Sequence, residues 1–103
     1  MNYEFIKTNF SQPLTNQQLS QRTGYHEYHL NRLFLRHTGT SIHRYILNTR
    51  ISEAKKLLLN SGESMARIAE LVGFGSNTHF STYFRQVEGI TPQHFRAQYK
   101  NRV

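Results

Sequence analysis

The chain has 103 residues, a length that allows one modest hydrophobic core and excludes two independent ones. Thirteen Lys and Arg against six Glu and no Asp give a formal charge of +7, which favours a polyanionic partner, with nucleic acid ahead of an anionic membrane surface. The absence of Cys excludes disulfide frameworks and thiolate metal sites. Because no signal peptide and no apolar run of the roughly 20 residues that span a bilayer is present, we expect a protein of the reducing cytoplasm that does not enter a membrane.

Strand signals are scarce, and most of the chain shows the 3.6-residue periodicity of helices. The sequence therefore predicts an all-α fold with seven helices, at residues of about 2–10, 16–22, 26–37, 42–60, 65–72, 77–87 and 92–101. The segment 42–60 is the longest and carries a continuous apolar face, so we expect it to be the spine of the domain.

Several of these helix boundaries have a chemical cause. Hydroxyl residues stand where N-caps are expected, namely Thr15 with Gln18 as a capping box, Ser41, Ser64, and Thr91 followed by a proline at the first helical position. Three glycines stand just past predicted helix ends, where a left-handed residue is common: Gly39, Gly62 and Gly89.

Two copies of one pattern flank the long segment. Leu19-Ser20, Gly24-Tyr25, His29-Leu30, Phe34 and Gly39 recur as Ile68-Ala69, Gly73-Phe74, His79-Phe80, Phe84 and Gly89, at an offset of 49 that becomes 50 after one inserted residue. The residues that follow each copy also match, Ser41 and Tyr45 with Thr91 and Phe95. The chain is therefore predicted to hold one unit twice.

Each copy has the spacing of a helix-turn-helix. A small residue, Ser20 or Ala69, lets the second helix cross closely, and Gly24 or Gly73 supplies the positive φ of the turn. An αα-hairpin that only packs is the alternative, but the duplication and the positive charge favour DNA binding. The expected boundaries are about 15–38 and 64–87 for the two units, 42–60 for the joining helix and 92–101 for a C-terminal helix.

The second helix of the second copy has an unusual polar face. Short hydrogen-bonding side chains, which are mediocre helix formers, stand opposite its apolar side at Asn77, Thr78, Ser81 and Thr82. In a helix-turn-helix the second helix enters the major groove, where Asn pairs with adenine and Thr offers a methyl group to thymine. Asn77 and Thr78 also suit the first turn of any helix, so a purely structural role remains the alternative for them.

The matching helix of the first copy carries Tyr28, Asn31 and Arg32 at the corresponding positions. We expect Arg32 to pair bidentately with guanine and Asn31 with adenine, each worth about 1–3 kcal/mol of discrimination. The alternative for Arg32 is a phosphate contact alone.

The remaining basic residues of interest are interpreted as phosphate contacts or structural ion pairs, because phosphate and sugar take most protein–DNA hydrogen bonds. They are Arg22, Arg36, Arg50, Lys55, Lys56 and Arg85. His26 and His29 are spaced like metal ligands but lack a third ligand, so no metal and no other cofactor is expected. No catalytic motif is found, and we expect no enzymatic activity.

The second copy also carries the motif IA-x-x-VGF at residues 68–74, then F-x-x-x-F at 80–84 and G-x-TP-x-x-FR at 89–96. Through these motifs the chain closely resembles the DNA-binding domain of the AraC/XylS family of bacterial transcription regulators, over about nine-tenths of its length. The resemblance implies a seven-helix, homeodomain-like fold with two helix-turn-helix subdomains on a long linker helix. It also implies recognition helices about one helical turn of DNA (~34 Å) apart on double-stranded DNA, and activation of transcription through RNA polymerase as a second partner.

The chain departs from the family pattern at three positions. His26 replaces a capping Ser, Arg67 replaces an acidic capping-box partner, and Thr82 replaces a common Arg. Loss of that Arg predicts weaker contact by the second subdomain, so we expect the first to dominate specificity.

The rival hypothesis is a helical protein–protein interaction module that does not bind DNA sequence-specifically. A ligand-binding or dimerisation domain, which most family members carry, is not part of this sequence. The chain is either a complete small regulator or an excised C-terminal domain, and its abrupt start favours the second; we expect the domain alone to be monomeric.

Overall fold

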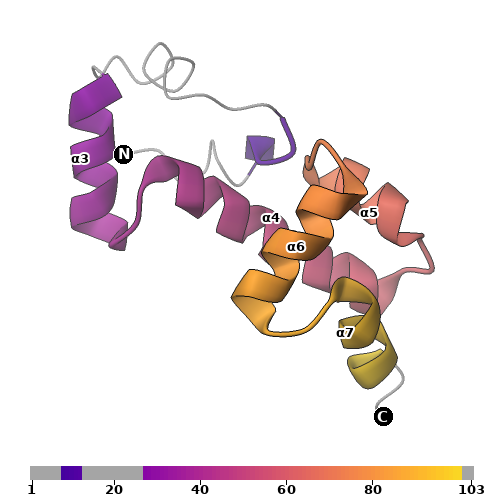
Figure 1. Cartoon of the computed structure of the whole chain (residues 1–103). Helices are drawn as coiled ribbons and strands as arrows, with labels where there is room; N and C mark the ends of the chain where they lie inside the picture. Colours follow the sequence, from indigo (N-terminus) through magenta and orange to yellow (C-terminus); the bar gives the residue numbers. More distant parts are fainter. Residues whose placement is uncertain (1–7, 13–26, 101–103) are drawn as a thin grey trace. The chain divides into compact units, whose positions relative to one another are not determined.

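The computed structural model describes residues 8–12 and 27–100, and these residues form helices joined by short turns (Figure 1). Five helices lie within them: α3 (Glu27–Thr38), α4 (Ile42–Asn60), α5 (Met65–Val72), α6 (Asn77–Glu88) and α7 (Pro92–Tyr99). Within the described part of the chain, none of these helices combines the length and the apolar character that crossing a membrane requires.

The prediction of seven helices is wrong for the described residues, which contain five. Of the predicted helix at 2–10, the structure describes only residues 8–10, of which 8 and 9 are helical; the amide of Gln12 closes a turn on the carbonyl of Asn9 at 3.0 Å. Asn and Ser are poor helix formers, and Pro13 disfavours a helical conformation at the residue before it, so the chain turns at residues 10–12. The predicted helix at 16–22 lies outside the described residues.

The chain divides into two compact units, residues 1–49 and 50–103. The first unit contains α3 and the first half of α4. Its buried cluster consists of Leu30, Phe34, Ile42 and Ile46, with Tyr45 packed against it. The Phe34 and Tyr45 rings meet edge to face at 5.5 Å between centroids, a favourable aromatic geometry.

The second unit contains the rest of α4 with α5, α6 and α7, and α6 contacts both α5 and α7 (Figure 1). Its core is aromatic. Phe84, which is fully buried, lies 5.8 Å from Phe80 and 5.5 Å from Phe95 between ring centroids. Aliphatic side chains from α4 and α5 complete this core: Ile51, Ala54, Leu58, Ile68, Ala69 and Val72.

The predicted N-caps in the described residues are confirmed. The side-chain oxygens of Ser41, Ser64 and Thr91 each accept a hydrogen bond from the amide three residues later, at 3.1 to 3.2 Å. Gly39 and Gly89 take the predicted left-handed conformation, with φ of 79° and 85°. Thr15 lies outside the described residues.

The prediction for Gly62 is wrong, since this residue does not have a positive φ. Side chains from α7 and from the residue after it donate instead to carbonyls at and after the end of α4. The Arg96 guanidinium donates to the carbonyls of Leu58, Ser61 and Glu63 at 3.0, 3.2 and 2.7 Å. Lys100 Nζ also donates to the Ser61 carbonyl, at 2.6 Å. A glycine cap is unnecessary where cationic side chains reach the last carbonyls of a helix.

Candidate nucleic-acid interface

The turn between α5 and α6 has the geometry predicted for a helix-turn-helix. Gly73 ends α5 with φ of 99°, and the Phe74 amide donates to the Ala69 carbonyl at 2.9 Å. Ala69 is buried, as expected of the small residue that lets a second helix pass closely. The Ser76 side chain then accepts from the His79 amide at 3.0 Å, which starts α6 at Asn77.

Helix α6 is buried on one side and polar on the other. Phe80 and Phe84 are fully buried, whereas Asn77, Thr78 and Thr82 are exposed and Ser81 is half-buried. The four predicted base contacts of this helix therefore share a surface, and no side chain of the described residues is shown bonded to their polar groups. Short polar side chains on such a surface allow close approach to base edges in a major groove.

On helix α3 the predicted base contacts are not equally exposed. Arg32 is exposed, and it lies opposite the buried Leu30 and Phe34. Asn31 is half-buried, and its Oδ1 accepts a long hydrogen bond, 3.4 Å, from the Ile42 amide. Asn31 thus helps to hold α3 on the first turn of α4, and its amide NH2 group is the part left to donate. The side chain of Tyr28 lies outside the described residues.

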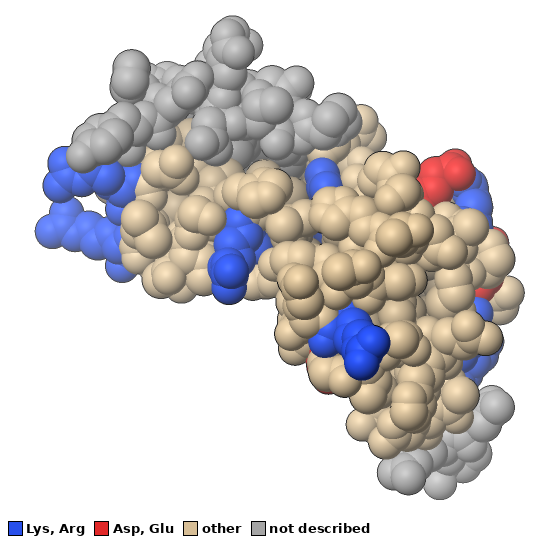
Figure 2. Space-filling view, in the orientation of Figure 1, with Lys and Arg blue, Asp and Glu red and all other residues tan. Residues whose placement is uncertain are grey.

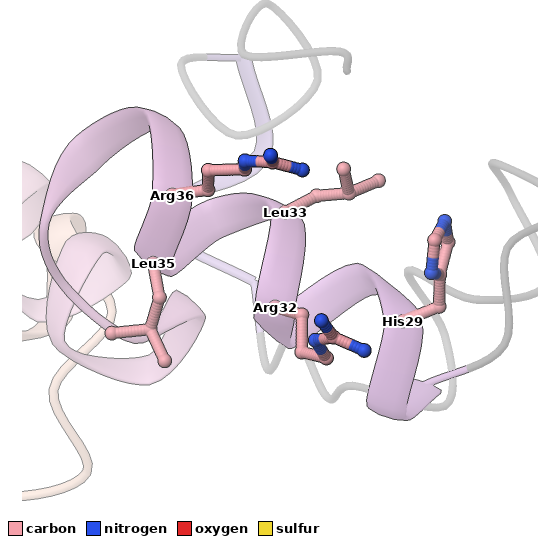
Figure 3. A pocket seen from close by; sticks show the side chains of 5 residues that line it. All are labelled: His29, Arg32, Leu33, Leu35 and Arg36. Atoms are coloured by element: carbon pink, nitrogen blue, oxygen red, sulfur yellow. The ribbon is translucent and has the colours of Figure 1, made fainter.

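An open hollow of about 430 Å³ lies against α3. Its described lining consists of His29, Arg32, Leu33, Leu35 and Arg36. These side chains leave the helix in different directions and do not converge on one point (Figure 3). The hollow is therefore part of the helix surface, and its basic and apolar lining suits a broad polyanion better than a small ligand.

Two of the predicted phosphate contacts are engaged inside the second unit. The Arg50 guanidinium stands 5.9 Å from the centre of the Phe74 ring, and burial lowers the pKa of Arg50 from its ordinary value. Lys55 Nζ is 2.9 Å from a carboxylate oxygen of Glu88 and 5.7 Å from the centre of the Phe95 ring. These contacts are compatible with a structural role, one of the two predicted alternatives, and the phosphate contact of both residues stays a prediction.

The other predicted phosphate contacts lie on the surface. Lys56 is paired with Glu53 at 3.0 Å within α4, an exposed pair that can exchange for a phosphate at little cost. Arg36 on α3 and Arg85 on α6 are exposed. Arg22 lies outside the described residues.

Ion pairs neutralise several carboxylates of the described residues. Three Glu in this part of the chain pair with nearby cations, namely Glu53 with Lys56, Glu70 with Arg67 and Glu88 with Lys55. Figure 2 shows Lys and Arg at several separate places on the visible face, and its large red area lies directly beside blue atoms. No acidic residue occurs between positions 28 and 52, which include four Arg. A polyanion meets little repulsion on this stretch.

Leu35 is an exposed residue of α3 that was not among the predicted site residues, with 53% of its surface accessible. The repeat contains the signal for it, because an offset of 50 pairs Leu35 with Arg85 on the polar side of α6. Among the described residues, no group of three His, Asp or Glu lies close enough to hold a metal ion.

This arrangement, a helix-turn-helix whose second helix is polar and exposed, defines a DNA-binding domain. Residues 19–98 match the helix-turn-helix domain family. The multiple antibiotic resistance protein MarA of Escherichia coli is 31% identical over 93 residues, which cover 90% of this chain and 73% of MarA. The chain belongs to the AraC/XylS family, as an AraC-type DNA-binding domain.

Solved structures agree with this membership. A transcriptional regulator with an AraC-type DNA-binding domain from Chromobacterium violaceum is 31% identical, with a TM-score of 0.89 over 97% of this chain and 89% of that one. The DNA-binding domain of AdpA, solved in complex with a target DNA, is 24% identical and shares the fold with a TM-score of 0.90, over 94% of this chain and 87% of that one. The chain is thus a DNA-binding domain of the kind found in transcription regulators.

Proposed function

We propose that this chain binds double-stranded DNA sequence-specifically, with α3 and α6 as recognition helices in successive segments of the major groove. The observation that carries the proposal is the polar surface of α6, formed by the exposed Asn77, Thr78 and Thr82 and the half-buried Ser81. It lies opposite the fully buried Phe80 and Phe84. Solvent-facing helix surfaces without a function favour Glu, Lys and Gln, which are better helix formers.

The internal repeat supports a role for both helices. The two copies give one chain two candidate recognition helices, so a monomer can address both parts of a site. On α3 we assign guanine reading to Arg32, which is exposed, and keep Tyr28 and Asn31 as further base contacts. On the flanks, Arg36 and Arg85 are exposed cations suited to phosphates.

Selection of bound duplexes from a random pool at physiological salt tests this proposal. We expect enrichment of a bipartite motif whose parts lie about 10 bp apart, one helical turn of DNA. Enrichment of only one part would mean that one of the two units positions the protein on DNA without reading bases. Salt-sensitive binding without any enrichment would contradict base reading, because phosphate contacts alone account for such binding.

The rival function is a protein–protein interaction module built on helix-turn-helix units. It predicts no duplex binding even at low salt, where phosphate contacts are strongest. The absence of acidic residues between positions 28 and 52 favours DNA over that alternative.

The resemblance to regulators that contact RNA polymerase supports activation as the direction of control, in the cytoplasm where bacterial DNA lies. A reporter gene with the selected site upstream of its promoter tests this. Expression should rise with the wild-type chain and stay at the basal level with an Arg32→Ala variant.

A further inference from the structure

Helix α3 carries an exposed leucine among basic and polar neighbours. Leu35 is 53% exposed, and Arg32, Arg36 and His37 are also exposed. A single exposed apolar side chain is common on soluble proteins and needs no explanation by itself. The position of Leu35 is the informative feature.

Leu35 lies on the same side of α3 as the proposed guanine reader. It follows Arg32 by three residues, and residues three apart are neighbours on a helix surface. In Figure 3 the side chains of Arg32 and Leu35 leave the helix on its lower side, whereas Leu33 and Arg36 leave it on the upper side. Arg85, the repeat partner of Leu35, is exposed on α6 one turn beyond Ser81 and Thr82.

The major groove offers one apolar group on base edges, the C5-methyl group of thymine, and apolar side chains recognise it by contact. We infer that Leu35 is a specificity-determining residue that reads a thymine methyl group in the part of the site bound by α3. This inference rests on the proposed function, because it requires α3 to lie in the major groove.

The spacing also places the thymine. Three residues advance about 4.5 Å along a helix, and successive base pairs are about 3.4 Å apart. The thymine that Leu35 contacts therefore lies within about two base pairs of the guanine that Arg32 contacts. The first part of the site combines a guanine and a thymine methyl, whereas α6, with Arg85 in place of Leu35, adds a cation at the matching position.

Uracil substitution in the selected duplex tests the inference, because uracil lacks only the methyl group and keeps the base pairing of thymine. Each thymine of the first part is replaced in turn, and the dissociation constant is measured. For wild-type protein, one replacement should weaken binding about fourfold, the value of one buried methyl-sized group. The Leu35→Ala variant should bind the thymine duplex about fourfold more weakly than wild type and should not distinguish thymine from uracil.

Matched variants exclude a general effect of removing surface methyl groups. Val87→Ala shortens another exposed apolar side chain, 44% accessible, that lies off the polar side of α6; it should keep the wild-type preference for thymine. Leu35→Met, which keeps an apolar side chain of similar volume, should keep it as well. Circular dichroism checks that each variant folds.

Three outcomes would overturn the inference. Equal binding of thymine and uracil at every position of the first part excludes a methyl contact, and an unchanged preference in Leu35→Ala assigns the contact to another residue. Both leave the proposed function intact, since base preference persists. If wild-type protein shows no base preference in any duplex, the proposed function fails and this inference fails with it.

Discussion

The turn that follows α3 and the turn that follows α6 are two versions of one structure. Their glycines have φ of 79° and 85°, and each is followed by a hydroxyl N-cap with bonds of 3.2 and 3.1 Å. The ring pairs Phe34–Tyr45 and Phe84–Phe95 share a centroid distance of 5.5 Å, with interplanar angles of 71° and 73°. A few residues at fixed spacing therefore specify the same local geometry twice.

The exposed surfaces of the same two helices differ. On α3 the offset of 50 pairs Arg32, Leu35 and Arg36 with Thr82, Arg85 and Gln86 on α6. All six side chains are exposed, so their identities are free of packing demands. The two copies thus share their scaffold and differ at their surfaces, as expected if each helix contacts a different set of bases.

The largest predicted effect on stability comes from removing the aromatic ring that both units share, Phe34 in the first and Phe84 in the second. Phe34→Ala and Phe84→Ala should each lower the free energy of unfolding by about 3–5 kcal/mol, because each empties a buried ring site. Urea denaturation followed by circular dichroism measures both. A loss under 1 kcal/mol for either variant would mean that its ring is not part of a packed core, and the two scaffolds would not be equivalent.

Arg96 is a position at which the two copies differ, and its removal is expected to cause the next largest loss of stability. Its repeat partner, Ile46, is buried in the first unit, whereas Arg96 donates three hydrogen bonds to carbonyls at and after the end of α4. Arg96→Ala should cost about 2–3 kcal/mol of stability, since it leaves several carbonyls without a donor.

Arg67→Ala is the control for Arg96, because Arg67 makes an exposed ion pair with Glu70 on α5. Such a change should lie within about 0.5 kcal/mol of wild type. Equal stability of the Arg96 and Arg67 variants would contradict the capping role of Arg96.

Removing one Arg from α3 and one from α6 compares what the exposed surfaces of these two helices contribute to DNA binding. Arg32→Ala should relax base preference in one part of the site by about 1–3 kcal/mol, as expected for a lost guanine pair. Arg85→Ala should weaken binding to all duplexes alike and flatten the slope of log K against log salt by about one unit. Fluorescence anisotropy titrations over a range of salt concentrations measure both. Loss of affinity without a change of preference in both variants would refute this division of roles.

The smallest effect probes the turn glycines. Gly39→Ala and Gly89→Ala should each cost about 1 kcal/mol, because their positive φ disfavours a side chain while an added Cβ would meet nothing within 4 Å. Gly75→Ala is the matched control, since Gly75 has equal space and no positive φ. Thermal unfolding should give similar losses for Gly39 and Gly89 and none for Gly75.

Much of the fold could be predicted because its signals are local. The N-cap Ser64, the proline after Thr91 and the repeat of Phe34 at Phe84 predicted helix boundaries and core positions that the structure confirms. The count of seven helices was wrong for the described residues, which contain five; of the predicted helix at 2–10, residues 8 and 9 are helical and the chain turns from residue 10.

The roles of individual basic residues could not be predicted in the same way. Whether Arg50 or Lys55 faces solvent depends on Phe74 and Glu88, which are distant in sequence. The same is true of Gly62, since α4 is capped by Arg96 from a helix more than thirty residues later. Charge and residue type identified candidates, whereas the partners of Arg50 and Lys55 within the second unit are visible only in the structure.

Base reading by two separate helices is tested most directly by repeating the random-duplex selection with Arg32→Ala and Thr82→Ala, which change matching positions of the two copies. Two recognition helices that read different bases predict that Arg32→Ala alters one part of the enriched motif and Thr82→Ala alters only the other. Changes by both variants in the same part, or in both parts together, would contradict independent reading by α3 and α6.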